Sequence, residues 1–394
     1  MMDLYVSPFE FGAVGDGRHD DTLALQSALA AAQSRKQSVT LTGGTFCTDC
    51  LTLLPGVSVT AEPTWGYRRN GNAVLVPLRA EQPYLLDCSN ATGVTLRGLC
   101  LDGGHMGENM HGIYCHRSTI NRDLGEHTVR IEDCQIKGFT GDGAHLEGIW
   151  AISVRDSHFH DNAGYGFYLD GTDAFVVDNW FSGNGIGFGS DTWNSAVNFT
   201  SNRVEWNKRC GLRLCGSMRY NVTGNYFDRS FGPAIVIEDA KNYHKRLEKT
   251  HTVMPYAITI TGNNIVRSGK EAVPDSDDDC HILMKNAVGV TITSNTFNVW
   301  KDDGRHGRVS PWNGIIYENC SHCVIAHNTM LPGAVKALFV DRGGHNTGVT
   351  VKDNVGDTVP EKAWHCQDPF TPVHFMSEGD APWFSEKLQG ENND

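Results

Sequence analysis

The sequence predicts an all-β fold, a right-handed single-stranded parallel β-helix of about ten or more coils with a short N-terminal capping helix. Ten stretches between Val94 and Val355 share one short pattern of alternating apolar residues, which is typical of strands rather than helices. In most copies a small polar residue follows, and a bulky apolar residue stands two positions after it. The commonest spacing between copies is about 23 residues, a repeat length typical of solenoids.

The polar column indicates how the coils stack. Its members, in chain order, are Leu99, Cys134, Ser157, Asn179, Asn202, Asn225, Asn263, Asn295, Asn328 and Asn354. An asparagine amide at a sharp inward bend can bond the same amide one coil up and one coil down, which satisfies buried backbone and side chain together. The apolar residues two positions later would form an interior stack of Phe159, Phe181, Val204, Phe227, Ile265, Phe297 and Met330.

The first element expected is a cap over the open apolar end of the solenoid, at residues 8–40. Asp20 or Asp21 can cap a helix that starts near Asp21. The apolar residues expected near one face of this helix are Leu23, Leu25, Ala28 and Leu29. The segment FGAVGDGRHDDTLALQSALAAAQSRKQ, residues 11–37, resembles the N-terminal signature of the pectin-lyase-like superfamily, shared by family 28 polygalacturonases, related sugar-active enzymes and phage tailspikes. This resemblance implies the β-helix fold.

The rest of the chain is expected to continue as one domain over residues 1–359, with a C-terminal tail over residues 360–394. Short strands over residues 39–86 would form irregular first coils, with an excursion over residues 64–70, and the regular coils span residues 94–355. Three long loops are expected to build a binding face on one side of the solenoid, near residues 239–256, 269–280 and 301–313.

Composition narrows the classes of partner. There are 46 acidic and 33 basic residues, and the formal charge of −13 argues against nucleic acid. The chain start lacks a basic and apolar leader and no segment is long enough to span a membrane, so we expect a cytoplasmic protein without a membrane partner. The twelve cysteines are interpreted as reduced packing residues, including the Cys47 and Cys50 pair.

No cofactor or metal is expected. A run of aspartates could bind Ca²⁺ through its oxygens, but it lacks a spaced glycine and a partner carboxylate, so a solvated acidic loop is the preferred interpretation. The run consists of Asp275, Asp277, Asp278 and Asp279.

The candidate site comes from a second strand in each coil, generally opened by glycine. Its outward positions align as two columns because side chains alternate across a strand. One column reads His116, Glu147, Asp170, Asp191, Cys215, Glu238, Lys285, Glu318 and Asp341, and the column two residues earlier includes Tyr114, His145, Tyr168 and Arg213. The candidate catalytic residues are Glu147, Asp170, Asp191, Glu238, His145 and Arg213. The candidate substrate-binding residues are Tyr114, His116, Tyr168, Trp150, Trp193, Trp312 and Lys285.

Stacked carboxylates on neighbouring coils would lie about 4.8 Å apart at the backbone. Their repulsion would raise the pKa of one beside an ionised neighbour, which is the arrangement that glycoside hydrolysis needs. Such a ladder also occurs as a solvated surface without a function, and for any single acid that interpretation has at least equal weight. The cluster of acids with histidine, tyrosine and arginine on adjacent coils favours a site.

Comparison with known β-helical families narrows the reaction. Residues 171–175 (GTDAF) resemble one motif of family 28 polygalacturonases only faintly, and the other motifs are absent, which argues against that activity. Inulin fructotransferases use two acids on neighbouring strands and work as trimers, and Asp228 with Glu238 could offer a similar pair.

The function predicted is cleavage or rearrangement of glycosidic bonds in an oligo- or polysaccharide by carboxylate acid/base catalysis, by a glycoside hydrolase or a transferase of the inulin fructotransferase kind. One alternative is a polysaccharide lyase with an arginine, lysine or histidine base. The other is a non-catalytic sugar-binding or tailspike-like module. We expect a homotrimer, because solenoids with a tail and long one-sided loops often bury a flank against copies of themselves, and homo-oligomers normally close by symmetry.

Overall fold

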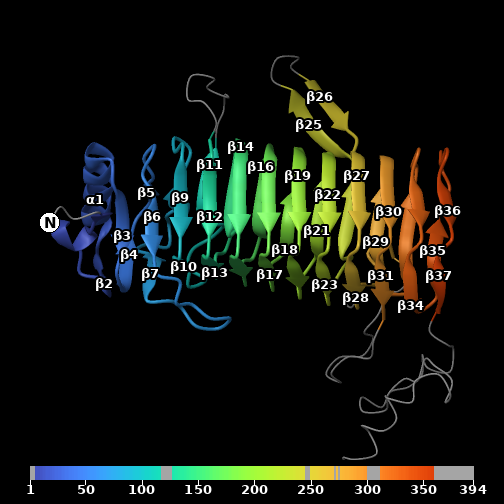
Figure 1. Ribbon diagram of the computed structural model, residues 1–394, viewed down its shortest axis with the longest axis horizontal. Coiled ribbons are helices and arrows are strands. Elements are labelled where there is room, and N and C mark those ends of the chain that lie inside the picture. Colours follow the sequence, from blue (N-terminus) through green and yellow to red (C-terminus); the bar gives the residue numbers. More distant parts are fainter. Residues whose placement is uncertain are drawn as a thin grey trace, which may run out of the picture.

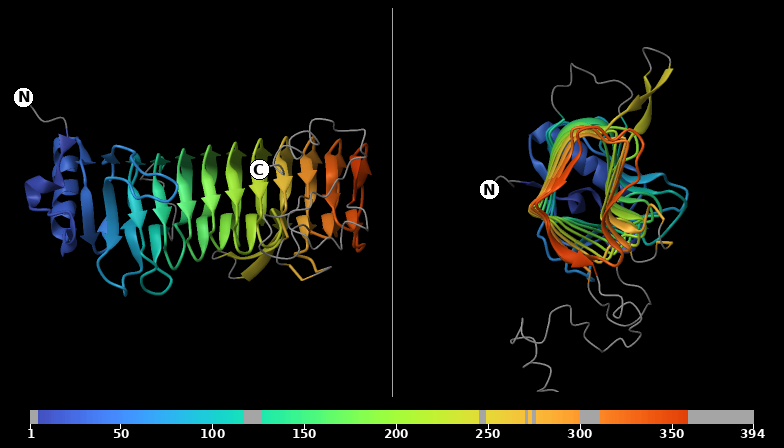
Figure 2. Two further views of the ribbon diagram at one scale, coloured as in Figure 1. Left: turned by 90° about the horizontal axis from the view of Figure 1, so that it is seen from below. Right: turned by 90° about the vertical axis from the view of Figure 1, so that its right-hand side faces the viewer.

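The computed structural model describes residues 5–116, 127–244, 249–269, 272–273, 276–299 and 311–358, with the side chains of Tyr243 and His244 excepted. The expected C-terminal tail, most of the loop at residues 301–313 and Asp275 lie outside this part. The described chain forms a right-handed parallel β-helix that rises from the N-terminal cap in regular coils (Figure 1, Figure 2). The predicted fold class and number of coils are confirmed.

Each regular coil contributes one strand to each of three faces. Faces A and B belong to one 22-stranded sheet, which bends at a corner, and face C is a separate 13-stranded sheet. All pairings within these sheets are parallel, as in β14 with β16. Backbone groups of a strand inside the solenoid therefore bond the coils before and after it.

Face A consists of β5 (Leu51–Thr52), β8 (Tyr84–Asp87), β11 (His111–His116), the first half of β14 (Ala144–Arg155), the first half of β16 (Tyr165–Val177), β18 (Ile186–Ser190), β21 (Cys210–Cys215), β24 (Ile235–Glu238), β29 (Cys280–Lys285), β32 (Asn313–Glu318) and β35 (Ala337–Asp341). Face B consists of β1 (Tyr5–Val6), β3 (Ser38–Leu41), β6 (Val59–Ala61), β9 (Val94–Arg97), β12 (Val129–Glu132), the second halves of β14 and β16, β19 (Asn194–Thr200), β22 (Ser217–Thr223), β27 (Tyr256–Thr261), β30 (Val288–Thr293), β33 (Val324–Ala326) and β36 (Thr350–Lys352).

Face C consists of β2 (Asp16–Asp20), β4 (Gly44–Thr48), β7 (Ala73–Pro77), β10 (Cys100–Asp102), β13 (Gln135–Lys137), β15 (His158–His160), β17 (Trp180–Ser182), β20 (Arg203–Glu205), β23 (Tyr226–Asp228), β28 (Asn264–Val266), β31 (Thr296–Asn298), β34 (Thr329–Ala334) and β37 (Val355–Thr358). The remaining elements are the 3-10 turn η1 (Pro8–Phe11), the helix α1 (Thr22–Arg35) and an antiparallel hairpin of β25 (Ala240–His244) and β26 (Lys249–Val253). A hairpin thus replaces much of the long loop expected near residues 239–256.

Helix α1 covers the N-terminal end of the solenoid, as predicted (Figure 1). Asp20 Oδ1 accepts the Thr22 amide at 3.0 Å, whereas the Asp21 carboxylate accepts the amides of the preceding loop at Val14 and Gly15. Leu23 is 79% exposed, so its expected place on the buried face is wrong. The buried residues of the helix are Ala24, Leu25, Ala28, Leu29 and Ala32. No helix in the described part of the chain has the length and apolar character needed to cross a membrane.

The asparagine column forms the predicted ladder between faces B and C. Asn202 Nδ2 donates to Asn225 Oδ1 at 3.1 Å, and the Asn202 backbone amide donates to the same oxygen at 2.8 Å. The same pairing runs from Asn179 to Asn354. A second, shorter ladder of Asn162, Asn184 and Asn207, between faces C and A, was not foreseen.

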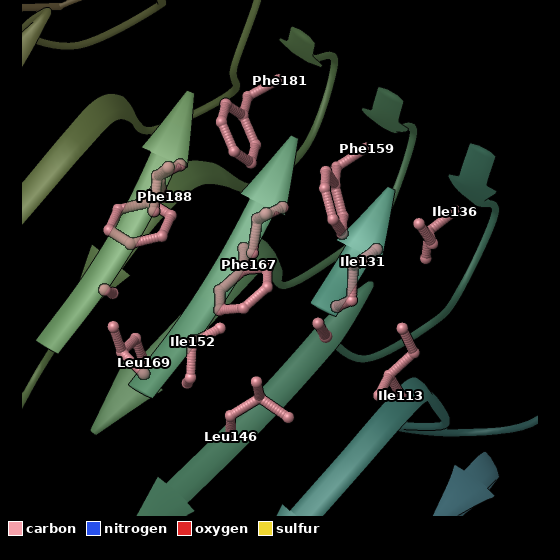
Figure 3. Close-up of a cluster of buried hydrophobic side chains, with 14 of the residues drawn as sticks. Ile113, Ile131, Ile136, Leu146, Ile152, Phe159, Phe167, Leu169, Phe181 and Phe188 are labelled. Carbon is pink, nitrogen blue, oxygen red and sulfur yellow. The ribbon is translucent and has the colours of Figure 1, made fainter. Parts of the chain in front are cut away.

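The interior is a continuous apolar core in which rings stack from coil to coil. Phe159 and Phe181 lie 5.3 Å apart between ring centroids in the predicted column. Leu146 and Leu169 point into this core (Figure 3), so their neighbours along the strand point outward. At Gly166, which opens one of these strands, a Cβ would lie 2.6 Å from the Gly187 carbonyl oxygen of the next coil. The eleven described cysteines are free, and all except Cys50 are buried.

Replacing Asn225 by Ala is expected to lower the free energy of unfolding by about 1–3 kcal/mol, because Asn202 and Asn263 each lose a buried amide partner. Urea denaturation would measure the change. The matched control is Asn221→Ala, which removes an exposed asparagine from strand β22 and should cost much less. Equal stabilities for the two variants would contradict the expectation that the buried asparagine ladder stabilises the fold.

Candidate functional site

The outward residues of β11, β14 and β16 meet where face A ends at its corner with face B. The strand register pairs His116 with Glu147 and Glu147 with Asp170. The position two residues earlier pairs Tyr114 with His145 and His145 with Tyr168. The two predicted columns are therefore adjacent on three successive coils, about 4.8 Å apart at the backbone.

A chain of hydrogen bonds fixes Glu147. Asp142, in the turn before β14, accepts the Tyr165 amide on Oδ1 at 2.6 Å. Its Oδ2 lies 2.6 Å from His145 Nδ1, and His145 Nε2 lies 3.3 Å from Glu147 Oε1. His116 Nδ1 contacts the other oxygen of Glu147 at 2.5 Å. Both oxygens of Glu147 are thus held by imidazoles.

These contacts separate the charge states of the groups. Burial alone would lower the pKa of His145, but hydrogen bonds to Asp142 and Glu147 outweigh it and raise that pKa to about 9. The His145 hydrogen bond lowers the pKa of Glu147 to about 2, against the effect of burial. At neutral pH an imidazolium therefore lies between two carboxylates, and Glu147 is ionised.

The pKa of Asp170 is shifted in the opposite direction. Burial raises its pKa, a hydrogen bond from Thr192 partly offsets this, and the charge of Glu147 raises it further. Thr192 Oγ1 lies 2.9 Å from Asp170 Oδ2 and 3.1 Å from the Tyr168 hydroxyl. An ionised carboxylate and a carboxyl group with a raised pKa thus occupy neighbouring coils, as the stacked acids predicted.

A column of rings borders the two acids along face A. Tyr84 and Tyr114 stack at 4.9 Å between centroids, Tyr114 and His145 at 5.9 Å, and His145 and Tyr168 at 4.6 Å. Tyr168 is buried, whereas Tyr84 and Tyr114 are half-buried. The stack holds the His145 ring between two tyrosines, so its orientation toward Glu147 is fixed.

Because the folded-state pKa of His145, about 9, lies above its ordinary value of 6.5, its stabilising contribution is present below pH ~6.5 and is lost as pH rises through ~9. We expect the stability difference between the wild type and His145→Gln to shrink by about 1–3 kcal/mol from pH 6 to pH 10. Urea titrations at both pH values would measure it. His19→Gln, a replacement of an exposed histidine near the N-terminus, is the control. A difference that is constant or grows with pH would show that His145 is not held as a cation.

Asp191 does not continue the acid ladder. Strand β18 ends at Ser190, and Thr192 takes the place beside Asp170. Arg213 Nε donates to Asp191 Oδ1 at 2.6 Å, and Arg213 NH2 pairs with Glu238 Oε1 at 2.7 Å. These three predicted residues form a separate ion-paired cluster toward the C-terminal coils.

The other predicted residues are spread more widely. Trp150 follows the bend at Gly148 and pairs in register with Thr172 on face B, and Trp193 lies at the corner itself, next to Thr192. Lys285, on β29, lies four coils beyond Asp170, about 19 Å along the axis.

Trp312, before β32, is one coil further, about 24 Å from Asp170. The structure therefore does not bring Trp312 and Lys285 to the two acids. Asp228 and Glu238 lie on faces C and A, so they do not form the neighbouring pair suggested by fructotransferases.

One set of side chains in the described part of the chain could hold a metal ion. The ligand atoms of His111, Asp142 and His145 lie within 4.8 Å of one another. Asp142 already contacts both histidines, and its amide donates to His111 Nδ1 at 3.0 Å, so a cation would have to displace these bonds. In the aspartate run considered for Ca²⁺, Asp277 pairs with Lys285 and Arg342.

Sequence alignment of the strands missed Asp142 and Thr192. Both lie in turns, outside the alternating positions from which the columns were built. Asp142 stands directly before Gly143, which aligns with the glycines that open neighbouring strands. A search for acids one residue before these glycines would have found it.

Comparison with known proteins agrees with this architecture. Residues 88–250 match a family model described as a right handed beta helix region. This match agrees with the right-handed β-helix of the structure. No curated protein matches the chain in sequence.

Among solved structures, the A-module of mannuronan C-5 epimerase AlgE4 from Azotobacter vinelandii is similar with a TM-score of 0.61 and 17% identity, over 89% of this chain and 99% of that one. The surface adhesin PfbA of Streptococcus pneumoniae has a TM-score of 0.64 and 14% identity, over 90% and 92% of the chains. The catalytic unit of a GH87 alpha-1,3-glucanase from Streptomyces thermodiastaticus has a TM-score of 0.60 and 16% identity, over 91% and 70%. At these identities the likeness concerns the fold, which serves enzymes and an adhesin alike.

Proposed function

We propose that this protein cleaves or rearranges glycosidic bonds of an oligo- or polysaccharide, with Asp170 as the general acid and Glu147 as the nucleophile. The observation that carries the proposal is the pair itself: Glu147 and Asp170 are register partners on adjacent coils, and their pKa values are shifted in opposite directions. Two carboxyl groups whose environments shift their pKa values apart are what glycosidic bond cleavage requires.

The reaction balances with these two groups. Asp170 gives its proton to the leaving glycosidic oxygen while a Glu147 oxygen bonds the anomeric carbon and the glycosidic bond breaks. Water then attacks that carbon, gives a proton to Asp170 and releases Glu147. If a hydroxyl of the bound sugar attacks instead, the product is a rearranged sugar, as in an intramolecular transferase. Carboxyl groups on adjacent coils suit the short separation of about 5–5.5 Å found in retaining enzymes.

The charges around the pair favour a neutral or weakly charged sugar. The cation of His145 is already bound between Asp142 and Glu147, so it is not free to pair with a substrate carboxylate. A polymer with a carboxylate on every ring would meet repulsion there. The ring stack that borders the acids offers apolar contact to a sugar, as aromatic side chains do in carbohydrate sites.

A lyase that uses Arg213 or Lys285 as its base is less well supported. Arg213 is paired with Asp191 and Glu238, and Lys285 with Asp277. A base must reach the proton that it removes, and both cations lie away from the two acids.

The test is a product-resolved screen with α-glucan, β-glucan, inulin and mannuronan. A saturated product that keeps the anomeric configuration, observed by NMR during the reaction, would support the proposed pair. An inverted product would argue for carboxyl groups further apart, and an unsaturated product that absorbs in the ultraviolet would replace the proposal with a lyase.

A further inference from the structure

The hairpin of β25 and β26 is an insertion at the corner that carries the two acids. Register pairs Cys215 with Glu238 and Met218 with Tyr256. Two residues lie between Cys215 and Met218, whereas seventeen lie between Glu238 and Tyr256. The coil that contains Glu238 therefore carries fifteen extra residues at this corner. They leave the solenoid directly after Glu238, in the column of Glu147 and Asp170.

The hairpin does not fold back onto the sheet that it leaves. Both side views show it projecting from the solenoid and leaning toward the N-terminal coils, where β14 and β16 lie (Figure 1, Figure 2). Its base is anchored, because Asp239 accepts a hydrogen bond from Asn286 and because Ala240 and Val253 are buried. A Cβ at Gly216 would lie 3.0 Å from the Ala240 Cβ, so glycine makes room for this base.

Beyond its buried base, the hairpin carries exposed polar side chains. Lys241 and Lys249 are exposed, and Lys241 Nζ donates to Thr252 Oγ1 across the two strands at 2.7 Å. The two strands form a sheet of their own, and an isolated two-stranded hairpin is only marginally stable. The described strands carry the Lys241 amine and the Thr252 hydroxyl, which suit contact with a polar ligand.

We propose that this hairpin is one wall of the substrate groove and binds the part of a polysaccharide chain that runs from Asp170 toward the C-terminal coils. The cluster of Asp191, Arg213 and Glu238 would be the floor of that part. Glu238 lies three coils, about 14 Å, beyond Asp170, so only a chain of several sugar rings reaches the wall. This inference rests on the proposed function for its cleavage point at Asp170. The hairpin would make the enzyme selective for long polysaccharide chains.

The test replaces residues 239–255 by Gly-Ser, the dipeptide that joins Cys215 to Met218 one coil earlier. Binding is measured by affinity electrophoresis with the same four polysaccharides, and turnover is measured on oligosaccharides of increasing length. We expect the excised variant to lose about tenfold or more in affinity for the polymer, equivalent to ~1.4 kcal/mol, and to retain its turnover of the shortest substrate. Circular dichroism and melting should resemble the wild type.

A second variant keeps the hairpin and removes its cations, Lys241→Ala with Lys249→Ala. Its matched control is Lys208→Ala, an exposed lysine outside the corner. Unchanged polymer binding by the folded excised variant overturns the hairpin inference and leaves the proposed function standing. Weaker binding without any turnover by the wild type supports the hairpin and overturns the function. If the wild type binds none of the four polymers, both the hairpin inference and the proposed function are overturned.

Discussion

Replacing Asp170 by Asn is expected to lower turnover by about 10²–10⁴, the effect of removing a general acid. The amide has the shape of the carboxyl group, and it can still accept the bond from Thr192, but it cannot deliver a proton to the leaving oxygen. Glu147→Gln should have an effect of the same order, because an amide cannot form the glycosyl intermediate. Steady-state kinetics with a substrate from the product screen would measure both changes.

Stability separates this loss from unfolding. Asp170 is half-buried beside an ionised neighbour, so the Asn variant should be as stable as the wild type or more stable. Asp178→Asn is the matched control, since Asp178 is an exposed acid in the turn before β17 and lies outside the proposed site. A folded Asp170→Asn variant that retains full turnover would remove Asp170 from the mechanism. Weaker sugar binding without any wild-type turnover would indicate a binding module.

The fold could be predicted from sequence because its main signals repeat. The ladder from Asn179 to Asn354 and the phenylalanine stack use the same positions in successive coils, so each copy supports the others. The shorter ladder of Asn162, Asn184 and Asn207 has three members and is followed by Ser230 one repeat later, which hides it.

The site was predictable only where it follows the strand register. His116, Glu147 and Asp170 were aligned correctly because alternation fixes which residues point outward. Thr192 displaces Asp191 because β18 ends one residue too early for the column to continue. The local sequence does not locate the end of a strand to within one residue, since that end depends on contacts with the next coil.

Contacts that span several coils also could not be predicted from local sequence patterns. The excursion at residues 64–70, which precedes β7, reaches over face C as far as β17, where the Tyr67 hydroxyl lies 3.2 Å from Ser182 Oγ. Tyr67 also stacks on His158 at 5.0 Å. Residues 115 positions apart in the chain carry no shared periodicity, so the aromatic residues of the excursion could be noticed but not placed.

Face C contains an acid with a structural role, Asp228 on β23. Asp228→Ala is expected to lower the free energy of unfolding by about 3–5 kcal/mol. The Asp228 side chain is 1% exposed and pairs with Arg229 and Arg267. Arg267 binds it through Nε at 2.9 Å and NH2 at 2.7 Å, and Tyr226 donates from 3.3 Å. Removal of the carboxylate leaves two guanidinium groups, which are 17% and 11% exposed, without their shared anion.

Urea denaturation of Asp228→Ala would measure this cost, with Asp178→Ala as a control at an exposed acid in the turn before β17. Asp228→Asn should be intermediate, because the amide oxygen can still accept hydrogen bonds while the charge is lost. Turnover per folded molecule should stay near that of the wild type, since Asp228 lies on a different face from Glu147 and Asp170. A stable Asp228→Ala variant without turnover would reverse the assignment, because the acid would then serve catalysis on face C rather than the packing of its arginines.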